Sequence, residues 1–264
     1  MSRNVVLSTV DQRGVATLTL NRPEVHNAYD ERLIDELAKA LHGLSEDRRV
    51  RVVVLRGNGK HFQAGADLNC LRSLASASPE QNFAFSLRTT EAMRRLNAFP
   101  RPTVALVHGA CYGGGVGLVA CCDVAIATES AAFALTEVRW GVIPAPIIPQ
   151  LCAAMGVRSL RRYAVSGERF TARAAERIGL LHEVCPDGGL DDAAAPIVDA
   201  LLQSAPDAAA ASKRLVLEQA GLEISEQQVR ALALQAAVKR ASPEAVEGLR
   251  SFQDKRKPAW YPGG

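Results

Sequence analysis

The sequence of 264 residues lacks several patterns that would indicate a class of chemistry directly. Its five histidines show no HExxH or similar metal-ligating spacing, and its six cysteines form no CxxC pair. A nucleophile elbow of the GxSxG type and a phosphate-binding GxxxxGK[ST] loop are also missing. These absences argue against a metal site, a serine hydrolase with a nucleophile elbow and a P-loop nucleotidase.

An excess of charge of one sign is lacking too, because 31 basic residues face 28 acidic ones. Because the two signs of charge are so nearly balanced, the composition does not indicate a nucleic-acid partner. The first residues, MSRNVVLSTVDQRG, lack the long apolar segment of a signal peptide. The longest apolar stretch, 104–127, contains five glycines, His108 and Asp123, so we expect a buried strand and helix there and no membrane partner. Cysteines in apolar surroundings are typical of free thiols in the cytoplasm, which is the predicted location.

Hydrophobic periodicity predicts strands that alternate with helices. Residues 4–10 and 15–20 flank a turn and predict a hairpin, and 31–44 predicts a helix capped by Asp30. The segment 69–82 is polar and could be a mobile helix or a loop. Further strands are expected at 50–56, 103–107, 132–136 and 181–186, and further helices at 83–97, 150–165 and 171–180. Because the chain is almost all helical beyond Leu190, we expect an α/β core at 1–190 and a helical region at 191–264, in one continuous unit.

Two glycine-rich turns are the most informative segments, and each follows an apolar strand. They are 61-HFQAGADL-68 and 112-YGGGVGL-118. Glycine and alanine leave backbone N–H groups unshielded, so a ligand atom can approach them closely. Two such turns could aim one N–H each at a single oxygen, as in an oxyanion hole. The second turn does not match the dinucleotide motif GxGxxG, since Leu118 stands at its last position.

These motifs resemble the enoyl-CoA hydratase/isomerase (crotonase) superfamily along nearly the whole chain. The resemblance implies a spiral of ββα units with a helical C-terminal trimerisation region, assembled as a homotrimer or a hexamer. It also implies an acyl-CoA thioester substrate, whose coenzyme A is part of the substrate, so that no separate cofactor is expected. The matching segments are 22-RPEVHNA-28, 61-HFQAGADL-68, 108-HGACYGGGVGLVACCDVAIA-127, 133-FALTEVRWGVIP-144 and 249-LRSFQDKRKPAW-260.

The resemblance assigns a role to individual residues. The backbone N–H groups of Ala64 and Gly114 would hold the enolate oxygen, and Glu137 would be the catalytic base. The alternative for Glu137 is an ordinary carboxylate, solvated or paired with Arg139, and Asp123 is interpreted as structural. The residues expected to contact substrate or coenzyme A, the last two from a neighbouring subunit, are Val25, His26, Ala28, Gly65, Ala66, Asp67, Leu68, Gly117, Phe252 and Lys255.

One position departs from the pattern of the superfamily's hydratases, which use two glutamates. The second glutamate falls on Gly117, which has no side chain. The segment 145-APII-148 also departs from the glycine-rich run of two-glutamate hydratases. The pattern GGGxGLxxCCD at 113–123, the pattern TEVRxGxxP at 136–144 and the tail 255-KRKPAW-260 look most similar to the methylglutaconyl-CoA hydratase branch.

The expected reaction is hydration of a short or branched 2-enoyl-CoA, with Glu137 deprotonating the water. The missing second acid leaves three sources for the proton at the α-carbon: Glu137 itself, a substrate carboxylate or an ordered water. Two alternatives remain open, a double-bond isomerase that needs a single base and a catalytically weak acyl-CoA-binding protein.

Overall fold

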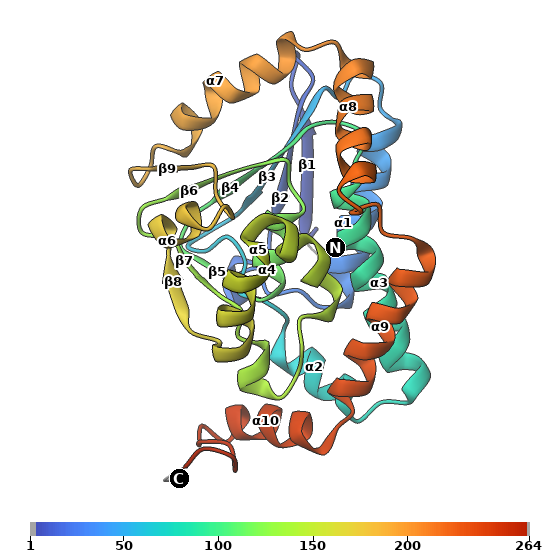
Figure 1. The fold of residues 1–264 in the computed structure, drawn as a ribbon, viewed down its shortest axis with the longest axis vertical. Coiled ribbons are helices and arrows are strands. Elements are labelled where there is room, and N and C mark those ends of the chain that lie inside the picture. The colour runs from blue at the N-terminus through green and yellow to red at the C-terminus, as the bar shows by residue number, and fades with distance from the viewer. Residues whose placement is uncertain (1–3, 263–264) are drawn as a thin grey trace.

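A six-stranded sheet forms the centre of the computed structural model, which describes residues 4–262 (Figure 1). Its strand order is β1-β2-β3-β4-β6-β9; the first pair is antiparallel and the other neighbours are parallel. The predicted hairpin is confirmed, and its turn is closed by Asp11, whose side chain accepts hydrogen bonds from the backbone N–H groups of Arg13 and Val15. The strands are β1 (Val6–Val10), β2 (Val15–Leu20), β3 (Val52–Gly57), β4 (Thr103–Val107), β6 (Val124–Thr128) and β9 (Glu183–Cys185).

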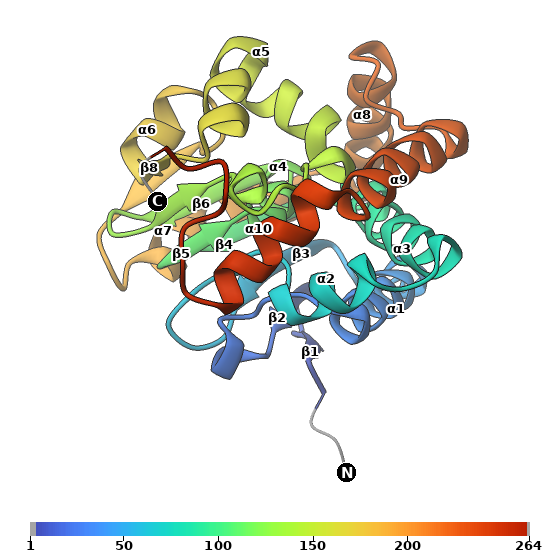
Figure 2. The same ribbon diagram turned by 90° about the horizontal axis from the view of Figure 1, so that it is seen from below.

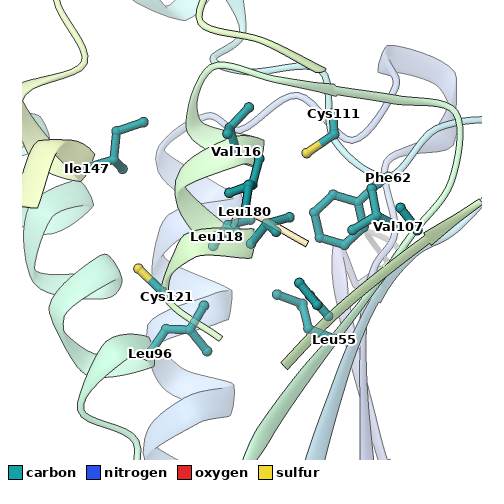
Figure 3. Packing of buried hydrophobic residues seen from close by; sticks show 14 of the residues in the cluster. Leu55, Phe62, Leu96, Val107, Cys111, Val116, Leu118, Cys121, Ile147 and Leu180 are labelled. Carbon is teal, nitrogen blue, oxygen red and sulfur yellow. The ribbon is translucent and has the colours of Figure 1, made fainter. Parts of the chain in front are cut away.

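Helices cover both faces of this sheet, which explains why β3 and β4 are apolar along most of their length. On one face, α7 (Leu190–Gln203) packs against residues of β2, β3, β4 and β6. On the other face lie α1 (Glu31–Glu46), α4 (Gly114–Ala120) and α5 (Ile148–Ser166), around a core that is shown from close by in Figure 3. The predicted cap of α1 is confirmed, because the Asp30 side chain accepts from the Leu33 N–H at 2.9 Å.

A second, three-stranded sheet lies beside the first and contains two strands that were not predicted. It pairs β5 (Ala110–Tyr112) with β7 (Ala132–Ala134) in parallel and β7 with β8 (Arg169–Thr171) in antiparallel fashion. The strand β5 begins three residues after β4 ends, and β8 is a short link between two helices, so neither stands out in the sequence as a separate strand. The helix α6 (Ala172–Arg177) follows β8 directly.

The polar segment 69–82 forms helices on both sides of a short turn. Here α2 (Leu68–Ala75) is followed by α3 (Pro79–Asn97), which begins four residues before the predicted start. The reason is a capping box, in which Ser78 and Gln81 each accept a backbone hydrogen bond from the other.

Three helices at the C-terminal end wrap the same side of the molecule. They are α8 (Pro206–Gln219), α9 (Glu226–Arg240) and α10 (Pro243–Gln253). Figure 1 shows α9 running along α3, Figure 2 shows α10 in front of the molecule beside α2 when seen from below, and the contacts between these helices agree. Within residues 4–262 no helix is long and apolar enough to cross a membrane. Large apolar side chains remain exposed on these helices and on the tail: Leu215, Val216, Leu234, Val238, Val246, Phe252, Trp260 and Tyr261.

Candidate active site

The two glycine-rich segments meet at one edge of the central sheet. They follow β3 and β4, which are parallel neighbours, so both strands end at the same edge. The segments are then joined backbone to backbone, because the Gln63 N–H donates to Ala110 and the Tyr112 N–H donates to Gln63, at 3.1 and 2.9 Å. The two turns therefore lie side by side, as a site formed by both of them requires.

A cavity of about 90 Å³ lies where these segments meet η2 (Glu137–Trp140), η3 (Ala145–Ile147), α3 and α9. Its walls are mainly apolar, including Phe85, Met93 and Trp140. Six of the predicted site residues line it: Ala64, Gly65, Ala66, Leu68, Gly114 and Glu137. Residues far apart in the sequence therefore form one enclosed site, as expected for a ligand pocket.

Glu137 is the only carboxylate among the described residues that line this cavity. Its Oε2 atom is buried and has no hydrogen-bond partner within residues 4–262, and it forms no ion pair with Arg139. Burial without a compensating cation raises the pKa of Glu137 from 4.5 to about 7. A carboxylate with this pKa can exchange protons near neutral pH, as a general base must.

The backbone N–H groups of Ala66 and Gly114, which both line the cavity, have no hydrogen-bond partner among residues 4–262. The Ala64 N–H, by contrast, donates to the His26 carbonyl at 3.0 Å. The prediction of Ala64 as an oxyanion donor is therefore corrected to Ala66. The cause is a short parallel pairing between residues 26–29 and 64–67, in which the N–H groups of Ala64 and Asp67 donate to the carbonyls of His26 and Tyr29 and the Ala66 N–H is left unused.

Glycines 113 and 114 allow the backbone to approach the other groups of the site. Gly113 has φ +50°, and a Cβ atom there would lie 2.9 Å from Oε1 of Glu137. A Cβ atom on Gly114 would lie 2.5 Å from the ring of Tyr29. Any side chain at these positions would displace the carboxylate or the aromatic ring, which explains the glycine run.

Gly117, the position of the second glutamate in two-glutamate hydratases, lies inside α4 and does not line the cavity. A Cβ atom on Gly117 would lie 2.2 Å from Cγ2 of Ile147. Ile147 lines the cavity and is drawn beside α4 in Figure 3, on the side away from Phe62. An apolar side chain therefore occupies the space that a glutamate at 117 would need.

Buried amides that the sequence analysis did not single out hold the loops of the site. The Asn27 side chain is fully buried, accepts from the Arg22 N–H, and donates to the carbonyls of Asn58, His61 and Phe62 at 2.8–3.1 Å. Gln63 is also fully buried, and its amide bonds both the N–H and the carbonyl of residue 65. Asn27 and Gln63 both lie in segments that match the superfamily, 22-RPEVHNA-28 and 61-HFQAGADL-68, and this is the signal that could have predicted these roles.

We expect Asn27→Ala to destabilise the fold by about 2–4 kcal/mol, because it leaves buried backbone groups of two loops without partners. Its backbone has φ +57°, which asparagine tolerates better than alanine does, so strain adds to the loss. Urea unfolding would measure the effect. Asn58→Ala is the matched control in the same region, since the Asn58 side chain bonds Asn21 near the surface. Equal stability of the two variants would contradict the prediction.

The remaining predicted site residues lie outside the cavity. Val25 and His26 lie at the surface, the latter edge-on to His61, and the buried Ala28 accepts a hydrogen bond from Arg22 through its carbonyl. Asp67 caps α2 and pairs with Arg22 at 3.4 Å. Their predicted contacts with coenzyme A remain predictions.

Neither of the two C-terminal residues predicted to reach a neighbouring subunit lines the cavity of its own chain. Phe252 packs edge-on against Trp140, with ring centroids 4.8 Å apart, and Lys255 is exposed. Elsewhere, Asp123 accepts hydrogen bonds from Thr103 and Lys213, which confirms its structural interpretation. The described part of the chain holds no group of three or more His, Cys, Asp or Glu residues arranged to bind a metal ion.

The chain belongs to the enoyl-CoA hydratase/isomerase family, whose sequence model matches residues 11–262. It is 32% identical to a 2,3-dehydroadipyl-CoA hydratase of Escherichia coli, over 94% of this chain and 95% of that one. It is 30% identical to a mitochondrial Delta(3,5)-Delta(2,4)-dienoyl-CoA isomerase of Dictyostelium discoideum, over 94% of this chain and 88% of that one. Its fold matches the crystal structure of an enoyl-CoA hydratase from Shewanella pealeana with a TM-score of 0.79 and 40% identity, over 97% of this chain and 96% of that one. The predicted crotonase fold is confirmed.

Proposed function

We propose that this protein adds water across the double bond of a short or branched 2-enoyl-CoA. The observation that carries the proposal is the buried, unpaired carboxylate of Glu137 in a cavity with two unpaired backbone N–H groups, those of Ala66 and Gly114. A base near neutral pKa beside an oxyanion site is the combination that addition of water to an α,β-unsaturated thioester requires.

In the proposed mechanism, the thioester oxygen accepts hydrogen bonds from the N–H groups of Ala66 and Gly114. Glu137 takes a proton from a water molecule, and the water oxygen forms a bond to the β-carbon. The electron pair of the double bond moves to give an enolate, whose charge the two N–H groups stabilise. Glu137 then returns its proton to the α-carbon, so that one carboxylate completes the addition of water.

The absence of a second acid supports this single-carboxylate route. Ile147 fills the space beside Gly117, and Glu137 is the one acidic side chain among the described lining residues. The cavity of about 90 Å³ is well below the size of sites for drug-sized ligands, which favours a short acyl chain. Together with the tail motif 255-KRKPAW-260, this favours a substrate of the methylglutaconyl type.

A double-bond isomerase is the second candidate, and the same single carboxylate favours it, since an isomerase moves one proton between two carbons. Incubation with crotonyl-CoA and methylglutaconyl-CoA, followed by mass spectrometry, separates the candidates. A gain of one water mass supports the hydratase, and an unchanged mass with a moved double bond supports the isomerase. Binding without any change of the substrate would overturn both and leave an acyl-CoA-binding protein.

Lys255 is proposed to bind coenzyme A phosphates of a neighbouring subunit in a trimer. Lys255→Ala should then raise KM several-fold and leave kcat unchanged, because a lysine offers phosphate a point charge. The effect should shrink as salt is added, since exposed charges are screened. Lys39→Ala, which removes an exposed lysine from α1, is the control. A KM equal to that of the control at low salt would contradict the assignment.

A further inference from the structure

Arg240 is a buried cation at the cavity whose charge no residue of the chain balances within residues 4–262. It belongs to the last turn of α9, is 6% exposed and lines the same cavity as Glu137. Its hydrogen bonds go to the carbonyl and side-chain oxygens of Asn82 and to the hydroxyl of Ser86, both on α3. These acceptors are neutral, and no described carboxylate forms an ion pair with the guanidinium.

The guanidinium also has unused donors. Arginine carries five N–H groups, and three hydrogen bonds are accounted for by Asn82 and Ser86. The Nε atom is buried and has no partner within residues 4–262. Burying a cation without an opposite charge is expensive, and burying its N–H group unbonded adds to that cost. A ligand carboxylate would relieve both costs, because its two oxygens accept two parallel N–H bonds.

Aromatic rings connect the oxyanion site to Arg240 along the cavity wall. Tyr29 lies against Gly114, where an added Cβ atom would contact its ring, and it stacks on Phe85 with ring centroids 6.3 Å apart. The guanidinium of Arg240 lies over the same Phe85 ring, 5.2 Å from its centroid. An acyl chain that runs from Gly114 toward Arg240 would therefore lie beside two rings, with the cation beyond them.

We propose that Arg240 binds a carboxylate at the far end of the acyl chain, so that the preferred substrates are CoA monothioesters of short unsaturated dicarboxylic acids. This inference rests on the proposed function for the position of the thioester. The apolar wall formed by Tyr29 and Phe85 takes the carbon chain, and the guanidinium takes the terminal anion. Neutral acyl chains of the same length leave the cation unbalanced and bind less well.

Binding of saturated analogues tests the inference without any reaction. Glutaryl-CoA carries a terminal carboxylate, and butyryl-CoA is the neutral thioester that lacks it. Titration calorimetry on the wild-type protein should give glutaryl-CoA at least a tenfold lower Kd than butyryl-CoA. If butyryl-CoA binds as tightly or more tightly, the inference is overturned, whether or not the protein is a hydratase.

Variants then assign the preference to the cation. Arg240→Met keeps the length of the side chain and removes its charge, so it should abolish the preference for glutaryl-CoA and leave the Kd of butyryl-CoA within about threefold. Ser86→Ala, which removes one neutral partner of Arg240, is the matched control and should keep the preference. If Arg240→Met raises the Kd values of glutaryl-CoA and butyryl-CoA by the same factor, Arg240 only joins α9 to α3, and the inference is wrong.

Kinetics separates this inference from the proposed function. Wild-type protein should hydrate glutaconyl-CoA with a kcat/KM at least tenfold above that for crotonyl-CoA, and Arg240→Met should reverse the order. If neither thioester is hydrated but glutaryl-CoA still binds preferentially, the hydratase proposal fails and the carboxylate site stands. If crotonyl-CoA is hydrated as well as glutaconyl-CoA, the hydratase proposal stands and the carboxylate site is refuted.

Discussion

Glu137→Gln should lower kcat for hydration by about 10²–10⁴-fold while KM changes little. The amide keeps the shape of the side chain in the cavity but cannot accept a proton from water. Steady-state kinetics on crotonyl-CoA and glutaconyl-CoA would measure the loss. Glu176→Gln, at a solvent-accessible position on α6, is the matched control and should keep full activity. If Glu137→Gln keeps more than about a tenth of the wild-type activity, Glu137 is not the catalytic base.

The pH dependence of kcat/KM of the wild-type protein tests the environment of the Glu137 carboxylate. Because the pKa of Glu137 is raised to about 7, kcat/KM should rise with pH and reach half of its maximum near pH 7. A half-maximum near 4.5, the ordinary value of a glutamate, would show that the carboxylate is solvated in the working enzyme.

The raised pKa also makes Glu137 a cost to stability, with a defined sign. The native state holds the proton of Glu137 more tightly than the unfolded state does. The contribution of the protonated carboxyl to the free energy of unfolding is therefore complete below pH 4.5 and is lost as pH rises through about 7. Glu137→Gln should therefore be more stable than wild type at pH 8, by up to about 3 kcal/mol, with a smaller difference at pH 5. Thermal unfolding at the two pH values would show it, and an equal difference at both would contradict the pKa shift.

Gly117→Glu should fold poorly or not at all, although it supplies the residue that two-glutamate hydratases carry. A Cβ atom at 117 would overlap Ile147, and overpacking of this kind costs typically 1–3 kcal/mol before the buried carboxylate is counted. Gly117→Ala, which adds the Cβ atom alone, should show the steric part. The measurement is the free energy of unfolding in urea, and wild-type stability of Gly117→Ala would contradict the prediction.

Combining Gly117→Glu with Ile147→Gly should recover much of the lost stability, because the second change removes the atoms that the new Cβ atom meets. The two changes should couple favourably in a double-mutant cycle, by at least about 1 kcal/mol. The folded double variant should also gain activity on crotonyl-CoA, since a second acid then reaches the cavity. Additive effects on stability would show that Ile147 is not what excludes a side chain at 117.

Most of the fold follows from patterns that are local in the sequence. Asp30 begins a helix because its side chain caps the first turn, and 31–44 stays helical because its apolar residues fall on one face. The short strands β5 and β8 could not be predicted in this way, because neither stands out as a separate run and each is fixed by its pairing with β7 from another part of the chain. The start of α3 is a different case, because the capping box of Ser78 and Gln81 is local in the sequence and only the polar composition of the segment suggested a loop.

The candidate site divides along a similar line. Glu137 and Gly114 were assigned from the motifs around them, and both line the cavity. The choice between Ala64 and Ala66 depends on which N–H group the neighbouring segment has already bonded, which spacing alone does not reveal. Arg240 carries no motif, and its position became informative only when α9 packed on α3 and left the guanidinium without an opposite charge.

The sequence by itself determined the family, the order of strands and helices apart from β5 and β8, and the lack of a second glutamate at position 117, because each depends on residue type and spacing. The tertiary structure decided which donors are unpaired, what fills the space beside Gly117, and which charges share the cavity with Glu137. These are properties of neighbours in space, because a hydrogen-bond donor is paired and a buried charge is compensated only by groups that lie close to it. For Glu137 and Arg240 those neighbours come from segments far apart in the chain.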